Sequence, residues 1–567
     1  MSLHYVKILF RNLRRDRTFA ILNFLGLSVG LVAFILIILY VRYESSFDGY
    51  HQDDEQIYRV IKQEHDNYYY GTDFFAVTQG PLAAALEDDF PEVEQAGRVW
   101  YQSDVVLGVD DRKKLEPRVY GIDPAIFSIF SFEVLEGTIA AFAERKNAMV
   151  ITATTARRLF GDGKALGQTI RYRNEHLFEV VAVIADMPDN SHFQMQVMVD
   201  FTGMATIENH NFERWNNSSI YTYLKLTSGA DPEELAGKLP AFVERYITAA
   251  GDNETSLYLE PLRDIYLRSQ ANFQLGPTND IRRLRIYVLI AILILVIACI
   301  NYVNLSTAKS VKRAKEVGVR KSIGASRRDL IGQFLGESFL HTGLALLFAL
   351  MLISIVLPSF SQFTGSHLDL NIETYQWLIP FLVGTCLLVT ILAGLYPAFV
   401  LSAFRPIAVL KGNLLQLQRK VSLRRILVIT QFTVSAVLII GAVVISRQLA
   451  YVQEKDVGYA KEQIVIVKLR DERFQGNDLS TLKRELRSLS IADRVASGSS
   501  LPNNLSSNSG AQWPGKPAEI DVSLYTAYVD EEYLPLFGMN LADGNHFSPE
   551  GEGARGGVIL NEKAVEA

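Results

Sequence analysis

Five long apolar stretches without Asp, Glu, Lys or Arg divide this sequence. Each is long enough to cross about 30 Å of hydrocarbon, which needs roughly 20 residues of helix. Two of them exceed that length, and aromatic residues in the excess indicate a short loop at the membrane surface. The pattern therefore predicts five membrane-spanning helices. The uncharged stretches are residues 18–41, 286–308, 338–368, 374–404 and 426–446.

Basic residues alternate between the connecting segments and give these helices a direction. Five precede the first helix, eight lie within 309–328 and six within 404–425, but none lies between 357 and 377. Because positive loops stay on the inner face, the N-terminus is expected inside and residues 43–283 outside. The first apolar stretch is too long for a secretory signal and has no cleavage site, which favours an uncleaved anchor.

The predicted order of segments follows from these two patterns. It is an inner N-terminus over 1–17, a helix over 18–42, an outer domain over 43–283, a helix over 284–308, an inner loop over 309–335, helices over 336–360 and 378–403, an inner linker over 404–425, a helix over 426–447 and a second outer domain over 448–567.

The first outer segment mixes two kinds of periodicity. Residues 177–187 and 220–227 alternate as strands do, whereas 81–90 and 231–249 have apolar residues at helical spacing. The predicted fold class is therefore a membrane protein with transmembrane helices and mixed α/β extracytoplasmic domains.

An internal repeat relates the two outer segments. Residues 120–137 resemble residues 528–544 in their order of acid, aromatic and terminal glycine, and residues 147–159 resemble 556–567 at an offset of 409. The chain is predicted to duplicate one helix followed by one outer domain. The second copy stops at Ala567, so we expect a truncated product that exposes apolar surface.

The amino-acid composition excludes several classes of protein. Hydrophobic residues make up 49% of the 567 positions and charged residues 21%, which excludes a disordered chain. The net charge of -6 gives no basic footprint for nucleic acid. Cys299 and Cys386 both lie in apolar runs, so neither a disulfide framework nor a cysteine-based zinc site is expected.

Catalytic motifs are missing from the sequence. The segment GDGKALG at 161–167 lacks the spacing and the hydroxyl residue of a phosphate-binding loop. Asp186, Asp189 and His192 could be read as a metal or hydrolytic cluster, but the intervening proline, asparagine and serine favour a turn. We therefore expect no catalytic residue, no metal and no bound cofactor in this chain.

Two features of the helices bear on their role. Gly26 and Gly30 form a GxxxG pair suited to close helix packing, although a chance pair is an equal alternative. No acidic or basic residue lies at the centre of a predicted span, and His341 is read as a polar residue near a helix end. This disfavours a proton relay or an ion-coupled transporter.

The inner loop within 309–339 is the most distinctive segment. It carries apolar residues at helical spacing, and Gly318 and Gly324 are expected to bend the chain at two points. An ordinary positively charged stop signal is the simpler alternative. The helical pattern instead favours an interfacial element that docks onto another protein. Its apolar positions are Val317, Ile323, Leu330, Ile331 and Phe334.

The sequence EVGVRKSIGAS at 316–326 carries a resemblance to a known family. With one helix before a large outer domain and three after it, the chain resembles the FtsX and MacB family of ABC transporter permeases. The resemblance is strongest to long duplicated permeases of Bacteroidetes-type bacteria. It extends over nearly the whole chain, including segments 12–30, 185–193, 261–269 and 393–412.

This resemblance implies a mechanism. The chain would be an inner-membrane permease with MacB-like periplasmic core domains, and a separate cytoplasmic ABC ATPase would hydrolyse ATP. Members of the family transmit ATPase closure to their outer domains, in export of peptides or drugs, in lipoprotein extraction or in control of cell-wall hydrolases. Besides the lipid bilayer, a periplasmic adaptor or an outer-membrane component could be a further partner. The expected ATPase-coupling residues are Glu316, Gly318, Arg320, Lys321, Gly324 and Ala325.

Two other classes of protein remain as alternatives. A membrane-anchored sensor also places a large domain after one helix, but it would be expected to carry a cytoplasmic output domain, and no inner segment exceeds about 30 residues. A membrane enzyme with an outer active site lacks any supporting motif. The permease is therefore the favoured interpretation, and its cargo is left undetermined.

Overall fold

The computed structural model describes most of the chain. The chain divides into two compact units, with the boundary between Ala442 and Val443. The predicted inner N-terminus and most of the linker over 404–425 lie outside the described residues. The described residues are 17–64, 72–109, 112–250, 255–368, 372–402, 421–460 and, with gaps, much of 462–566.

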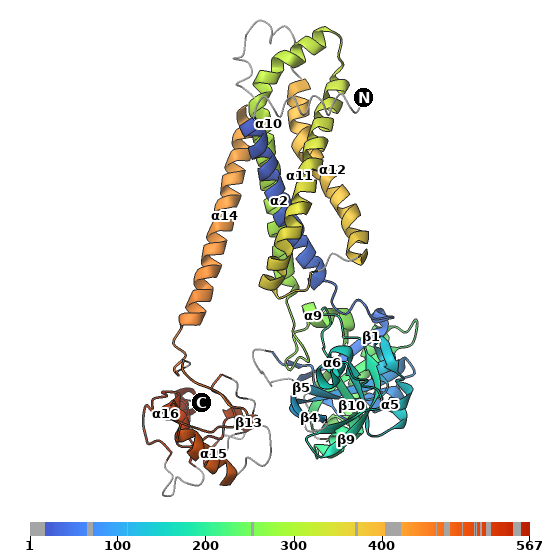
Figure 1. Ribbon diagram of the computed structural model, residues 1–567, viewed down its shortest axis with the longest axis vertical. Helices are drawn as coiled ribbons and strands as arrows, with labels where there is room; N and C mark the ends of the chain where they lie inside the picture. Colours follow the sequence, from blue (N-terminus) through green and yellow to red (C-terminus); the bar gives the residue numbers. More distant parts are fainter. Residues whose placement is uncertain are drawn as a thin grey trace. The chain divides into compact units, whose positions relative to one another are not determined.

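Five of the described helices are long and apolar enough to cross a membrane, and four of them pack together as a bundle (Figure 1). The core of this bundle is lined by aliphatic residues and by alanines that permit close approach, such as Ala291, Ala345 and Ala393. The fifth helix differs, because no residue in its most apolar stretch is buried. The helices are α2 (Arg17–Glu44), α10 (Ile281–Ser322), α11 (Arg327–Thr364), α12 (Ile372–Ser402) and α14 (Val421–Glu454).

Between α2 and α10 the chain forms a mixed α/β domain, here called the sheet domain. Its centre is a twelve-stranded sheet whose main path runs β12-β1-β11-β4-β5-β10-β7-β9-β6. The strands are β1 (Ile57–Glu64), β2 (Phe74–Phe75), β3 (Thr78–Gln79), β4 (Val93–Val109), β5 (Arg112–Ile122), β6 (Val134–Gly137), β7 (Ala148–Thr152), β8 (Thr169–Tyr172), β9 (His176–Ile184), β10 (Val197–Asp200), β11 (Ser218–Leu226) and β12 (Thr255–Pro261).

Short helices cover the sheet and connect its strands. Three begin at residues whose side chains cap the first turn, Thr152 before α6, Asp200 before α7 and Asp231 before α8. The helices are α3 (Leu82–Asp89), α4 (Ile126–Ile129), α5 (Ala140–Glu144), α6 (Ala153–Phe160), α7 (Phe201–Ile207), α8 (Pro232–Tyr246) and α9 (Ile265–Arg268), with 3-10 turns η1 (Asp54–Gln56), η2 (Thr248–Ala250) and η3 (Leu262–Asp264).

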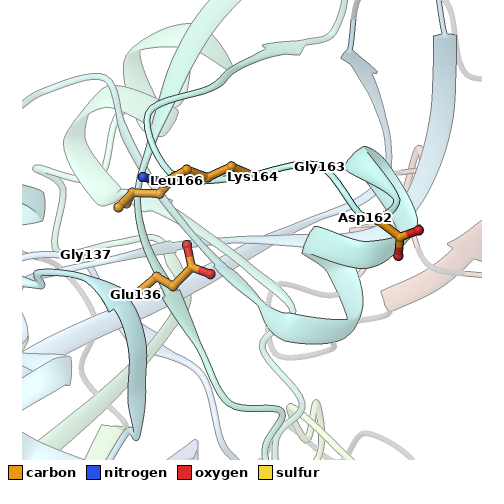
Figure 2. A pocket seen from close by; sticks show the side chains of 6 residues that line it. All are labelled: Glu136, Gly137, Asp162, Gly163, Lys164 and Leu166. Carbon is orange, nitrogen blue, oxygen red and sulfur yellow. The ribbon is translucent and has the colours of Figure 1, made fainter.

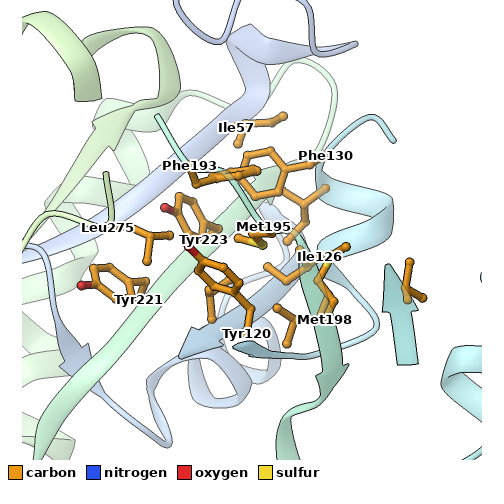
Figure 3. Close-up of a cluster of buried hydrophobic side chains, with 14 of the residues drawn as sticks. Ile57, Tyr120, Ile126, Phe130, Phe193, Met195, Met198, Tyr221, Tyr223 and Leu275 are labelled. Carbon is orange, nitrogen blue, oxygen red and sulfur yellow. The ribbon is translucent and has the colours of Figure 1, made fainter. Parts of the chain in front are cut away.

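Most neighbouring strands of the sheet are antiparallel, but β5 with β10 and β7 with β9 are parallel. One hydrophobic cluster fills the space between the sheet and the segments around α4 (Figure 3). Phe130 packs edge-on against both Phe193 and Tyr223 in this cluster. The mixed α/β fold expected for the first outer segment is therefore confirmed.

The second unit is smaller, and little of its described apolar surface is covered. It contains α15 (Asn477–Arg487), β13 (Ser507–Gly510), β14 (Ser523–Thr526), α16 (Tyr533–Leu536) and α17 (Glu562–Glu566). Tyr533 and Phe537 are buried. Val465, Ile491, Tyr528 and Val558 are each more than 70% exposed.

The repeated sequences adopt the same local structure in both units. In the sheet domain the Asp123 backbone amide donates to Arg98 O (3.1 Å), and the Arg98 amide donates to Asp123 Oδ2 (2.9 Å). In the second unit the Asp530 amide donates to Ser497 O (3.1 Å), and the Ser497 amide donates to Asp530 Oδ2 (2.7 Å). Each aspartate thus joins two neighbouring segments through its backbone and its carboxylate together.

A helix cap recurs in the same way at the offset of 409. Thr152 accepts a hydrogen bond from the Thr155 amide at the start of α6. Asn561 accepts one from the Ala564 amide at the start of α17 (2.9 Å). Both residues immediately precede a helix, and both satisfy an amide of its first turn.

Candidate functional site at the turn between α10 and α11

The segment predicted as an inner loop is mostly helical. Helix α10 continues through Gly318 to Ser322, so the interruption predicted at Gly318 is wrong. A helix tolerates an interior glycine at a cost of about 1 kcal/mol, and Glu316, Arg320 and Lys321 nearby are good helix formers. Within this segment α10 ends at Ser322 and α11 begins at Arg327, so residues 323–326 form the turn between the two helices.

The reversal itself depends on Gly324. This residue has φ +101, a conformation that residues with a Cβ rarely adopt. Ser326 then begins α11 with a capping box, in which its hydroxyl accepts from the Asp329 amide and Asp329 accepts from the Ser326 amide (3.2 and 3.0 Å). The turn is thus defined on both sides by local hydrogen bonds and conformation.

The two basic residues expected to face an ATPase bind within the bundle. Arg320 Nη1 donates to Gln333 Oε1 on α11. Lys321 Nζ donates to the backbone oxygen of Ser402 at the end of α12 (2.6 Å). These bonds hold the end of α10 against two neighbouring helices.

Apolar packing also holds the ends of α10, α11 and α12 together next to the turn. Val317, Leu330, Phe334 and Ala398 form a buried cluster that joins α10, α11 and α12. Ile323 shares their spacing in the sequence but not their burial, because it lies in the turn rather than in a helix. Its exposed fraction is 81%.

The tip of the turn is therefore apolar. Val319, one helical turn before Ile323, is also exposed. A large isoleucine displayed at a tight turn that is braced by hydrogen bonds suits insertion into a groove of another protein. Sequence spacing alone could not reveal this, since it grouped Ile323 with residues that are buried.

The glycine pair lies on the face of α2 that meets α10. A Cβ at Gly30 would lie 2.5 Å from the Ala298 Cβ, and one at Gly26 would lie 3.0 Å from Asn301 Nδ2. The distance to the Ala298 Cβ is shorter than any real contact between two Cβ atoms. With a larger residue at position 30, α2 and α10 could therefore not pack as they do.

The remaining candidates lie elsewhere. Glu316 belongs to the continuous helix α10, but its side chain is outside the described residues. Ala325 lies in the turn. Asp186 accepts from the amide and hydroxyl of Thr154, and His192 is buried against Asp48. Within the described residues, no group of three or more His, Cys, Asp or Glu could hold a metal.

An open hollow on the sheet domain lies between the end of β6 and the loop after α6 (Figure 2). Glu136, Asp162 and Lys164 contribute charges to it, but all three are exposed to solvent. Exposed charges lack the desolvation that tunes catalytic groups, so this hollow has no catalytic character.

Comparison with known proteins gives two family matches. Residues 20–242 match the MacB-like periplasmic core domain, and residues 288–406 match the FtsX-like permease C-terminal domain. Together these segments make up more than half of the chain.

Individual relatives point the same way. A macrolide export ATP-binding/permease protein MacB from Bdellovibrio bacteriovorus is 23% identical over 58% of this chain and 47% of its own length. The MacB of Pasteurella multocida is also 23% identical, over 52% of this chain and 42% of its own length. The chain thus spans less than half the length of these curated relatives.

Part of this chain also aligns with a solved structure. The periplasmic region of MacB from Actinobacillus actinomycetemcomitans aligns at 12% identity with a TM-score of 0.28, over 35% of this chain and 87% of that structure.

Proposed function

Because this chain belongs to the FtsX/MacB family of ABC transporter permeases, we propose that it transmits ATP hydrolysis in a separate cytoplasmic ATPase to its sheet domain. The turn at 323–326 would be the element that the ATPase moves. The membrane would be the inner membrane, with the turn inside and the sheet domain in the periplasm.

The single observation that carries this proposal is the shape of the turn. Its apolar tip at Ile323 is exposed, whereas Arg320 and Lys321 beside it are bound to Gln333 and Ser402. A force applied to the tip would reach α10, α11 and α12 together, because the bonds and the buried cluster below it join all three helices. Apolar contact is thus proposed to provide the affinity, and the basic residues to brace the turn.

The bundle suits a lever better than a pore. Within the described residues, α2 and the apolar parts of α10, α11 and α12 present no charged side chain at their centres. Movement of the sheet domain would then drive export of a peptide, drug or lipoprotein, or control another envelope process.

A detergent pull-down of the complete permease with the ATPase encoded beside it tests the proposal. Ile323→Asp removes a side chain whose burial in a partner groove contributes about 2 kcal/mol and places a charge there, so bound ATPase should fall at least tenfold. Ile323→Leu should retain binding.

The matched control is Ser322→Asp, which adds the same charge at an exposed neighbouring position without removing an apolar group. It should reduce binding less than threefold, a rough expectation for a charge at the rim of an interface. If wild type binds no ATPase, the permease proposal fails. If Ile323→Asp binds as well as wild type, the turn is not the docking element.

A further inference from the structure

The chain leaves α2 through a buried and strained turn. Asp48, four residues after the helix ends, has φ +58 although it has a side chain, and it is fully buried. Its amide donates to Asn190 O (2.9 Å), and the Asn190 side chain donates back to Ser46 O (3.1 Å). Aspartate adopts the left-handed conformation more readily than most residues other than glycine, and the hydrogen bonds around Asp48 hold it there.

Asp48 is connected to the middle of the sheet through His192. Asp48 Oδ1 accepts from the His192 amide (3.0 Å) and lies 2.8 Å from His192 Nδ1. On the other side of the ring, His192 Nε2 lies 2.8 Å from the hydroxyl of Tyr223 on β11. With its proton on Nδ1, the imidazole donates to Asp48 and accepts from Tyr223. All three side chains are buried.

The start of α10 also contacts the end of α2 and the loop that contains His192. Glu44, the last residue of α2, accepts from the Tyr266 hydroxyl (2.6 Å) and from Asn279 Nδ2 (2.7 Å). Gly276, just before α10, passes so close to the His192 loop that a Cβ there would lie 1.9 Å from His192 O. The end of α2 and the start of α10 therefore meet each other and the same loop of the sheet domain.

These contacts define a membrane-proximal junction, made of Glu44, Asp48, His192, Tyr223, Tyr266, Gly276 and Asn279. Swivelling at this point would separate buried carboxylates from their donors, which is far more costly than bending a solvated linker. The described residues that connect α2 and α10 to the sheet domain therefore form a fixed junction. A flexible linker at this place would absorb the motion of the helices.

We propose that this junction makes α2, α10 and the sheet domain move as one body, with His192 as its central positioning residue. The proposal rests on the proposed function and specifies the route of transmission. Tilting of α2 and α10 reaches the sheet undiminished, because β11 and the helix end share a continuous set of buried hydrogen bonds.

The test is a distance measurement in the full chain bound to its ATPase. Nitroxide labels replace Val29 on α2 and Leu177 on β9, both exposed, after Cys299 and Cys386 are changed to alanine. Pulsed EPR in nanodiscs compares the nucleotide-free and ATP–vanadate states. A rigid junction gives one narrow distance, unchanged between the states.

Tyr223→Phe removes only the hydroxyl that His192 binds. Its distance distribution should broaden, and hydrogen exchange at the His192 amide should become about tenfold faster, since a buried hydrogen bond has been lost. Tyr258→Phe on β12 is the matched control, because it removes an exposed hydroxyl with an equally long hydrogen bond of 2.8 Å to Gln63. It should behave as wild type.

Two results would overturn the proposal. One is a wild-type distance that shifts between nucleotide states, and the other is a Tyr223→Phe protein as narrow in distance and as slow in exchange as wild type. Bound ATPase and ATP hydrolysis are recorded in the same samples and should stay within twofold in Tyr223→Phe. If wild type binds no ATPase, the proposed function fails, while the nucleotide-free distances and the exchange rates still test the junction.

Discussion

The sheet domain and the second unit use the same aspartate-centred corner with different cations. In the sheet domain, Arg98 supplies both the backbone amide and the cation, its Nε and Nη2 donating to Asp123 Oδ2 and Oδ1 (2.8 and 3.1 Å). In the second unit, Ser497 supplies the amide, and Lys483 on α15 supplies the cation to Asp530. The backbone-to-carboxylate pair is retained, whereas the source of charge has moved to another element.

The short helix that follows each aspartate is held in place by the same kinds of contact. Ile126 and Tyr533 begin these helices and are buried, and their amides donate to the aspartate backbone oxygens. Backbone geometry at this corner therefore tolerates exchange of an aliphatic for an aromatic side chain. The corner depends on satisfying amides and less on which side chains surround it.

A buried histidine marks the main difference between the two corners. His51 Nδ1 accepts from the Ser131 amide (3.1 Å), and its ring lies 5.0 Å from that of Phe130. At the equivalent places the second unit has Ala460, whose amide donates to Phe537 O (2.7 Å), and Gly538. Of the two aspartate-centred corners, only the one in the sheet domain therefore has a titratable histidine, His51, packed beside it.

The largest expected effect is a pH dependence confined to the sheet domain. Burial lowers the pKa of His51 to about 4 from its ordinary 6.5, while Asp48 acts in the opposite direction. Between these values the unfolded chain binds a proton that the folded chain does not. Stability is therefore full above pH 6.5 and falls as the pH is lowered, by about 3 kcal/mol at pH 4.

Guanidinium unfolding of the solubilised full chain, followed by fluorescence of Trp100 and Trp215 after Trp377 and Trp513 are changed to phenylalanine, measures this dependence. The slope attributable to His51 is the difference between wild type and His51→Ala, because other groups titrate in both proteins. Parallel pH profiles for the two proteins would contradict the assignment.

A second prediction concerns the aspartates. Asp123→Ala and Asp530→Ala each leave a backbone amide without its acceptor, at a cost of about 2 kcal/mol or roughly 30-fold in local opening. Hydrogen exchange should accelerate at Arg98 in the first variant and at Ser497 in the second. Acceleration at both places in either variant would show that the corners are not independent.

The smallest predicted effect separates two glycines that end the repeated segments. Gly137 and Gly544 both have positive φ, +81 and +85, so alanine is strained at either position. Only at Gly137 would a Cβ also meet Val181 O, at 2.2 Å. Gly137→Ala should therefore cost at least about 1 kcal/mol more than Gly544→Ala, measured by local hydrogen exchange. Equal costs would show that the crowding at Gly137 relaxes freely.

The turn shows where prediction from sequence reached its limit. Gly318 and Gly324 stand six residues apart in one basic segment, and both were predicted to bend the chain. The first is helical and the second reverses the chain, because capping of α11 at Ser326 forces the reversal just before it. Arg320 and Lys321 could be recognised as functional candidates, but their partners on α11 and α12 are distant in sequence.

Periodicity and composition by themselves determined the apolar helices, the mixed α/β domain, the repeat and the family resemblance, because these depend on local patterns of polarity and spacing. The exposed tip at Ile323, the ring of His51 under its corner and the link from Asp48 through His192 to Tyr223 were decided only by the tertiary structure. The two histidine sites depend on residues that are brought together from distant segments, and a hydrogen bond across more than one hundred positions leaves no periodic signal in the sequence. The exposure of Ile323 depends on where α10 ends and α11 begins, which spacing alone did not reveal.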